Sequence, residues 1–144
     1  MSRAVVDTNI WISALLNPLG QPARVLQALE EGQFELVVSE PMLSEVEEVL
    51  QRPRIARKYG LRPDAGSELA GRLRRRAVLV PITRTLRLCR DPDDNLVIET
   101  AAVGQASVLV TRDDDLKADR DLVQVLQRAG IAVLSVRQFL ATLG

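Results

Sequence analysis

Short apolar runs rich in valine alternate along this chain with longer segments of helical periodicity. The runs cover residues 4–6, 36–38, 77–80, 108–110 and 131–134. Runs of this length between helical segments are typical of fully buried strands in a parallel sheet. Helices are expected at residues 22–31, 41–50, 64–76, 94–103, 122–128 and 136–143. The alternation predicts an α/β fold: a three-layer α/β/α domain, doubly wound around a central parallel sheet of about five strands.

Composition is that of an ordinary globular protein. The chain has 144 residues, of which 47% are apolar and 26% charged, so we expect a single domain spanning residues 1–144. No apolar run approaches the roughly 20 residues of a membrane helix, and no signal-peptide pattern precedes Asp7. We therefore expect a cytoplasmic protein that makes no membrane contact.

The scarcity of cysteine and histidine narrows the available chemistry. The lone Cys89 excludes an internal disulfide and a zinc site built from cysteines. Because the chain has no histidine, Ser-His-Asp triads, Cys-His pairs and histidine-based zinc sites are excluded as well. If the protein is an enzyme, we expect its catalytic groups to be carboxylates.

Acidic residues follow two of the predicted strands. The first strand ends in Asp7-Thr8-Asn9, and the strand at 108–110 is followed by Thr111-Arg112-Asp113-Asp114-Asp115. Parallel strands deliver their carboxyl ends to the same edge of a sheet, where the ligand crevice of α/β proteins lies. We therefore expect these acids to converge although they come from opposite ends of the sequence.

A third acidic segment, Asp91-Pro92-Asp93-Asp94-Asn95, opens the helix expected at 94–103. This helix is apolar on nearly all sides and should be deeply buried. Helical periodicity places Asp94 on the inward-facing stripe and points Glu99 the other way. The Asp94 carboxylate either caps the free amides at the start of its helix or faces the acids at the strand ends.

The helix at 41–50 carries the fourth candidate. Glu48 lies opposite its apolar face, whereas Glu45 and Glu47 flank that face, so periodicity leaves both open beside the alternative of solvated surface acids. Four carboxylates at one sheet edge would repel one another unless a cation lay between them. Oxygen ligands favour Mg²⁺ or Mn²⁺, ions that suit the hydrolysis of a phosphodiester.

Taken together, these residues resemble the PIN domain family of Mg²⁺- or Mn²⁺-dependent nucleases, which includes the VapC-like toxins of bacterial toxin–antitoxin pairs. The shared elements, in the family's order, are Val6-Asp7-Thr8-Asn9, an acid after Val37-Val38-Ser39, Asp94 with Ala101, and Thr111-Arg112-Asp113. The resemblance implies a metal-dependent endoribonuclease whose catalytic, metal-binding acids are Asp7, Glu45, Asp94 and Asp113. It implies accessory roles for Thr8, Asn9, Thr111 and Asp115.

The resemblance further implies an RNA substrate, a homodimer and a small antitoxin protein encoded beside the gene. Two alternatives are a catalytically weak PIN-like module that only binds RNA or protein, and a housekeeping RNA-processing nuclease. A dehalogenase-like phosphatase is disfavoured because Asn9 stands where its second aspartate is required. Metal-dependent turnover separates the nuclease from the binding module.

Basic residues cluster in the middle of the chain. The formal net charge is zero, yet residues 52–76 contain nine Lys or Arg against two acids. The RNA-binding candidates in this segment are Arg72, Arg74, Arg75 and Arg76. They either contact RNA phosphates, form a solvated helix face or contact acidic segments of an antitoxin. Trp11 is expected in core or dimer packing rather than in base stacking.

Overall fold

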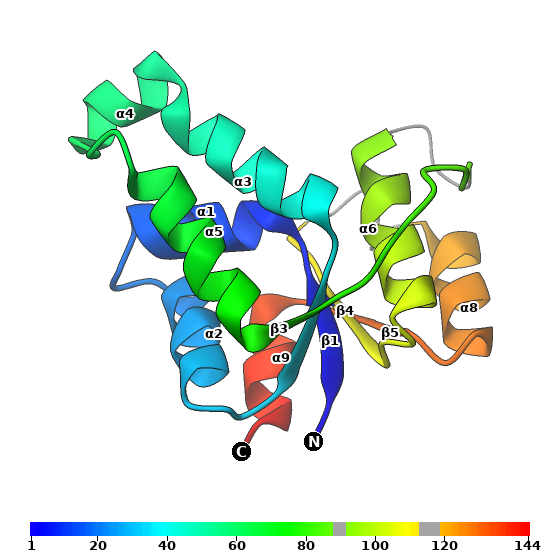
Figure 1. The fold of residues 1–144 in the computed structure, drawn as a ribbon. Coiled ribbons are helices and arrows are strands. Elements are labelled where there is room, and N and C mark those ends of the chain that lie inside the picture. Colours follow the sequence, from blue (N-terminus) through cyan, green and yellow to red (C-terminus); the bar gives the residue numbers. More distant parts are fainter. Residues whose placement is uncertain (88–91, 113–118) are drawn as a thin grey trace.

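Five parallel strands form one sheet in the order β3-β2-β1-β4-β5, as the computed structural model shows (Figure 1). The structure describes residues 1–87, 92–112 and 119–144. The strands are β1 (Arg3–Val6), β2 (Glu35–Val38), β3 (Ala77–Leu79), β4 (Val108–Val110) and β5 (Ala132–Leu134). Each coincides with one of the predicted apolar runs to within a residue, and the predicted α/β fold with its five-stranded parallel sheet is confirmed.

Helices cover both faces of this sheet. They are α1 (Thr8–Leu16), α2 (Gln21–Glu30), α3 (Glu40–Gln51), α4 (Pro53–Tyr59), α5 (Ala65–Arg76), α6 (Pro92–Val103), α8 (Arg120–Arg128) and α9 (Val136–Thr142). In Figure 1, α6 and α8 lie on one side of the sheet, and α2, α5 and α9 lie on the other. Within the described ranges, no helix has the length and apolar character needed to cross a bilayer.

The order of the strands explains this division. The chain passes from β1 to β2 to β3 in one direction, then returns through α6 to β4 and continues to β5. Because parallel crossovers are right-handed, reversing the direction of travel moves the connecting helices to the opposite face. The reversal lies between β1 and β4, and in α/β folds ligands bind beyond the carboxyl ends of the strands at such a point.

Burial of the strands decreases toward both edges of the sheet, most of all at β3. Residues 4–6 of β1 are fully buried, whereas Val78 and Leu79 of β3 are 36% and 45% exposed. The three residues of β5 are half-buried. The expectation that every strand is fully buried is therefore wrong for β3 and β5, because each lies at an edge of the sheet and pairs with a single strand.

Two of the helices, α1 and α4, were not among those predicted from the sequence. Residues Ile10, Trp11, Ile12 and Ala14 of α1 are all buried, and its two solvent-accessible polar positions, Asn9 and Ser13, are too few to produce a clear amphipathic pattern. Trp11 is 1% exposed, in agreement with its expected place in the core. The opposite holds for α4, which buries no residue at all.

The glycine-containing helix α5 forms as predicted, and one of its glycines has a packing role. A Cβ atom added to Gly66 would lie 2.9 Å from the carbonyl oxygen of Glu47 and 3.0 Å from its Cα. Gly66 thus allows the backbones of α3 and α5 to approach each other closely. A Cβ at Gly71 would meet only the end of the Arg75 side chain, at 3.8 Å, so no close backbone approach explains this second glycine.

Candidate functional site

The first candidate acid, Asp7, is fixed at the carboxyl end of β1. Val6 is paired with Val110 of β4, and the Asp7 N–H donates to the Val110 carbonyl at 2.9 Å. The Asp7 side chain is the N-cap of α1, with Oδ1 accepting from the backbone N–H of Asn9 at 3.3 Å. Its Oδ2 accepts from the Thr111 hydroxyl at 3.4 Å. The predicted meeting of the β1 and β4 ends therefore occurs, and Thr111 orients the carboxylate.

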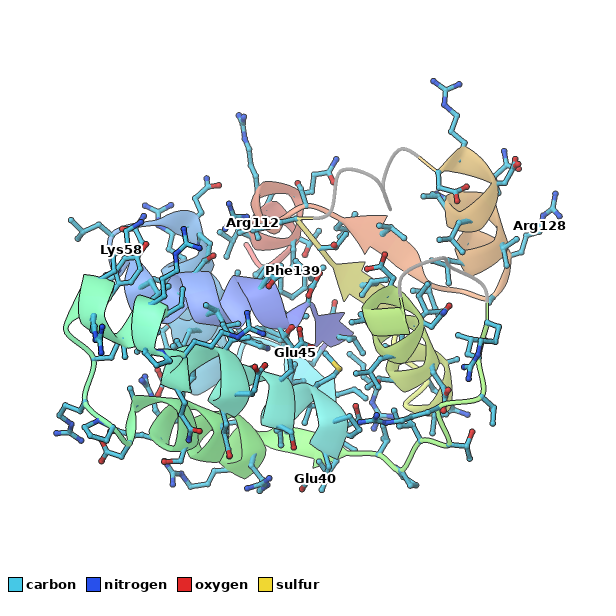
Figure 2. The ribbon with its side chains drawn as sticks, turned by 90° about the horizontal axis from the view of Figure 1, so that it is seen from above. Glu40, Glu45, Lys58, Arg112, Arg128 and Phe139 are labelled. Atoms are coloured by element: carbon cyan, nitrogen blue, oxygen red, sulfur yellow. The ribbon has the colours of Figure 1, made fainter. Side chains whose placement is uncertain are left out.

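The second candidate, Glu45, lies on α3, which begins directly after β2 at the same edge of the sheet. Figure 2 looks onto this edge and shows Glu45 near the end of β1, between α3 and α6 in projection. Glu45 and Glu47 are both half-buried, while Glu48 is exposed and pairs with Arg52 at 3.0 Å. The choice of Glu45 over Glu47 stays a prediction.

Asp94 belongs to the first turn of α6. Because α6 runs back across the sheet from β3 to β4, its first turn lies at the carboxyl edge with Asp7. The residues that share its stripe, Val97, Ile98 and Ala101, are all buried, as periodicity predicted. Asp94 itself is half-buried. Three elements thus bring three of the predicted acids to one edge.

Glu99 is the chemistry-bearing residue that sequence reasoning missed. It was expected to point away from the inward stripe of α6, yet it is only 7% exposed. The segment that follows β3 covers this face of the helix: the backbone N–H groups of Thr83, Arg84 and Leu86 donate to the Glu99 carboxylate at 2.7, 3.0 and 3.2 Å. The Thr83 hydroxyl donates as well, at 3.3 Å.

These hydrogen bonds determine the ionisation of Glu99. Burial on its own raises the pKa of the Glu99 carboxyl, but the hydrogen bonds from Thr83, Leu86 and Arg84 outweigh burial, and the pKa lies below its ordinary value. Arg84 has a φ of 61°, in the left-handed region that is unfavourable for a non-glycine residue. The carboxylate therefore anchors a strained turn against α6.

A buried hydroxyl pair fixes α6 against the end of β2. Ser39 Oγ and Thr100 Oγ1 are 2.9 Å apart, and Thr100 also donates to the Leu96 carbonyl at 2.8 Å. Both side chains are completely buried. The pair thus ties the helix that carries Asp94 to the strand that leads into the helix of Glu45.

The remaining predicted site residues fall into two groups, those outside the described part of the chain and those near the ends of β1 and β4. Asp113 and Asp115 lie outside the described residues. Thr8 and Thr111 are buried at the ends of β1 and β4, and Asn9 is exposed in the first turn of α1. Within residues 1–87, 92–112 and 119–144, no three Asp, Glu, Cys or His side chains form a group that could hold a metal ion.

The predicted RNA-binding arginines lie elsewhere. Arg74, Arg75 and Arg76 belong to the last turn of α5, which leads directly into β3. Two of the four candidates already have acidic partners: Arg72 pairs with Glu30 at 2.6 Å and Arg74 with Glu40 at 2.7 Å. RNA binding by this segment stays a prediction.

This chain is similar in sequence and in fold to known proteins. The chain is 31% identical over 119 residues to the uncharacterized protein MJ1680 of Methanocaldococcus jannaschii, covering 83% of this chain and 76% of the archaeal protein. It resembles in fold the crystal structure of VapBC2 from Rickettsia felis bound to a DNA fragment from their promoter. The TM-score is 0.61 at 15% identity, with 92% of this chain and 98% of that chain covered. The sequence profile described as the PIN domain matches residues 3–115, and the chain belongs to the PIN domain family.

Proposed function

We propose that this protein is a metal-dependent endoribonuclease that hydrolyses RNA phosphodiester bonds at the carboxyl edge of its sheet. PIN domains are generally nucleases that use divalent metal ions. One observation carries the proposal: Asp7, Glu45 and Asp94 come from three separate elements and meet the edge of the sheet at the reversal between β1 and β4. Ligands of α/β proteins bind at this position.

The donor atoms fit a hard divalent ion. Asp7, Glu45 and Asp94 offer only carboxylate oxygens, the ligands that Mg²⁺ and Mn²⁺ prefer. Because the described acids do not form a metal-holding group by themselves, we propose that Asp113, which directly follows Arg112, completes the site as the fourth ligand. A bound divalent ion supplies positive charge that neutralises the scissile phosphate and lowers the pKa of an attacking water.

The chain's own residues would orient the reacting groups. Thr111 and the backbone N–H of Asn9 each donate to one oxygen of Asp7, which fixes the orientation of this carboxylate at the strand end. We assign Thr8, Thr111 and the exposed Asn9 side chain to positioning carboxylates or water, and Asp115 to an accessory acidic role.

We further propose that the protein is the toxin of a toxin–antitoxin pair, a homodimer that binds a small antitoxin encoded beside it. The likeness to the VapBC2 structure supports this proposal because it extends over 98% of that chain. Copurification of the product of a neighbouring short reading frame would test it. If the protein has no such neighbour, a housekeeping RNA-processing nuclease becomes the better description.

Cleavage of single-stranded RNA by the purified protein tests the catalytic proposal. We expect cleavage with Mg²⁺ or Mn²⁺, none in a chelator, and none from Asp7→Asn or Asp94→Asn with either metal. Glu48→Gln is the matched control, because Glu48 is exposed and pairs with Arg52. Equal cleavage with and without chelator would overturn the metal mechanism. Loss of cleavage in Glu47→Gln but not in Glu45→Gln would assign the role proposed for Glu45 to Glu47.

A further inference from the structure

A groove of about 860 Å³ opens beside the acidic edge. Its walls come from the end of α1 and the turn into α2, the end of α4, the residues that follow β4 and the start of α9. Thr111 belongs to this wall and also donates its hydroxyl to Asp7. A molecule lying in the groove is therefore led directly to the acids of the proposed site.

The groove carries positive charge. Arg112 and Arg137 line it, and no acidic side chain does so among the residues that the structure describes. Arg112 Nη1 donates to Ser13 Oγ at 2.6 Å, which holds the guanidinium against α1, and Figure 2 shows Arg112 between α1 and α9. Both arginine side chains are exposed to solvent, as binding to a phosphate requires.

The walls also offer groups that contact nucleobases. Tyr59 lines the groove and is 42% exposed. Lys58 Nζ lies over its ring, 5.3 Å from the centroid, and the face that Lys58 leaves open can stack on a base with little sequence preference. Asn17 and Gln21 add side-chain amides, which can both donate hydrogen bonds to and accept them from base edges. The volume falls in the range of about 300–1,000 Å³ found for ligand sites.

We propose that this groove binds the segment of single-stranded RNA next to the scissile phosphate. Arg112 and Arg137 bind its backbone phosphates, and Tyr59 stacks on one of its bases. The proposal rests on the proposed ribonuclease activity and locates its substrate-binding surface at the carboxyl edge rather than on α5. Another occupant, an acidic peptide segment of a partner protein, is distinguished by the test.

Binding of a fluorescein-labelled single-stranded oligouridine, measured by fluorescence anisotropy in chelator at several salt concentrations, tests the proposal without cleavage. For the double variant Arg112→Gln/Arg137→Gln we expect weaker binding and a slope of log affinity against log salt that is flatter by about 1.4, because each single-strand phosphate contact contributes about 0.7. Arg128→Gln is the control, since Arg128 is exposed on α8 and lies far from the groove in Figure 2.

The aromatic contact has its own matched pair. Tyr59→Ala should weaken binding about tenfold, within the range for loss of one stacked base, whereas Tyr59→Phe keeps the ring and should bind like the wild type. Circular dichroism of each variant confirms that the fold is retained. A Tyr59→Ala variant that binds as tightly as the wild type would remove Tyr59 from the proposal.

The remaining outcomes separate this proposal from the proposed function. An unchanged salt slope in the double variant, or an equal loss in Arg128→Gln, would overturn the groove proposal even if the wild type cleaves RNA. Unchanged oligouridine binding with lost binding of a polyglutamate peptide would assign the groove to a peptide instead. If the groove variants lose RNA binding while the wild type cleaves no RNA with either metal, the groove stands and the proposed activity fails.

Discussion

Replacing Glu99 with glutamine should destabilise the protein far more than the change of one atom suggests. The carboxylate accepts backbone hydrogen bonds from Thr83, Arg84 and Leu86, one oxygen serving the first two and the other serving Leu86. Glutamine offers only one acceptor oxygen. If that oxygen keeps Thr83 and Arg84, the amide nitrogen faces the N–H of Leu86, donor against donor.

The magnitude follows from these contacts. A hydrogen bond to a charged group contributes about 1.5–3 kcal/mol, against about 0.5–1.5 kcal/mol for a neutral one. Glu99→Gln therefore loses about 1 kcal/mol at each of the two backbone bonds it keeps and about 1 kcal/mol or more at Leu86. Because the segment 83–86 is partly open to solvent, water recovers some of this loss, and we expect a fall of about 2–3 kcal/mol in the free energy of unfolding.

The effect should depend on pH in a defined direction. Since the pKa of folded Glu99 lies below its ordinary value, the carboxylate's contribution is fully present above the unfolded pKa of about 4.3. It is lost as the pH falls through the folded pKa, where wild-type Glu99 becomes neutral. The difference between wild type and Glu99→Gln should thus be constant near neutral pH and shrink below about pH 4.

Urea unfolding followed by circular dichroism measures both quantities. The matched control is Glu48→Gln, because the exposed pair between Glu48 and Arg52 should contribute at most about 1 kcal/mol. Equal destabilisation of the two variants, or a Glu99→Gln difference that stays constant into acid, would refute the assignment of Glu99 as a charged anchor.

Three further predictions concern packing and the site. Gly66→Ala should lower the free energy of unfolding by about 1 kcal/mol, since its Cβ would meet the backbone of Glu47, whereas Gly71→Ala should raise it by up to about 1 kcal/mol, both measured in urea. Thr100→Val should cost about 1–3 kcal/mol by leaving the buried Ser39 hydroxyl without its partner, and the double variant with Ser39→Ala should cost less than the two single losses together. Asp7→Asn should abolish cleavage while leaving the urea midpoint unchanged or higher, because it removes one of several neighbouring charges at constant volume.

The sheet was predictable because burial in a parallel sheet leaves a direct mark on the sequence. Runs such as Leu36 to Val38 have no polar positions, and each predicted run became a strand. Helix α1 was not recognised because most of its residues are apolar, so its pattern merges with that of β1. For α4 the marks were present, with Pro53 in its first turn and Gly60 at its end in the left-handed conformation, but its lack of an apolar face hid them.

The candidate site was predictable only as far as topology determines it. That Asp7 and Thr111 meet follows from two parallel strands ending at one edge, and their hydrogen bond is present. The role of Glu99 depends on the path of a segment that has no regular structure, and no periodicity encodes such a path. Arg72 and Arg74 pair with acids on other helices, so less positive charge is available to a ligand than the run of basic residues in the sequence indicates.

The match to the PIN domain family ends at residue 115, so the groove and the acids beside it come from two parts of the chain, one inside the match and one after it. Asp7, Glu45 and Asp94 belong to the matched part, whereas Arg137 and the start of α9 come after it. Strand β5 is constrained, because the Leu134 carbonyl accepts the N–H of Thr111. The exposed side chains of α9 are not constrained by such pairing within the sheet. Side chains on this wall of the groove can therefore change, and with them what the groove accommodates, without any change in the part of the chain that carries the acids of the proposed site.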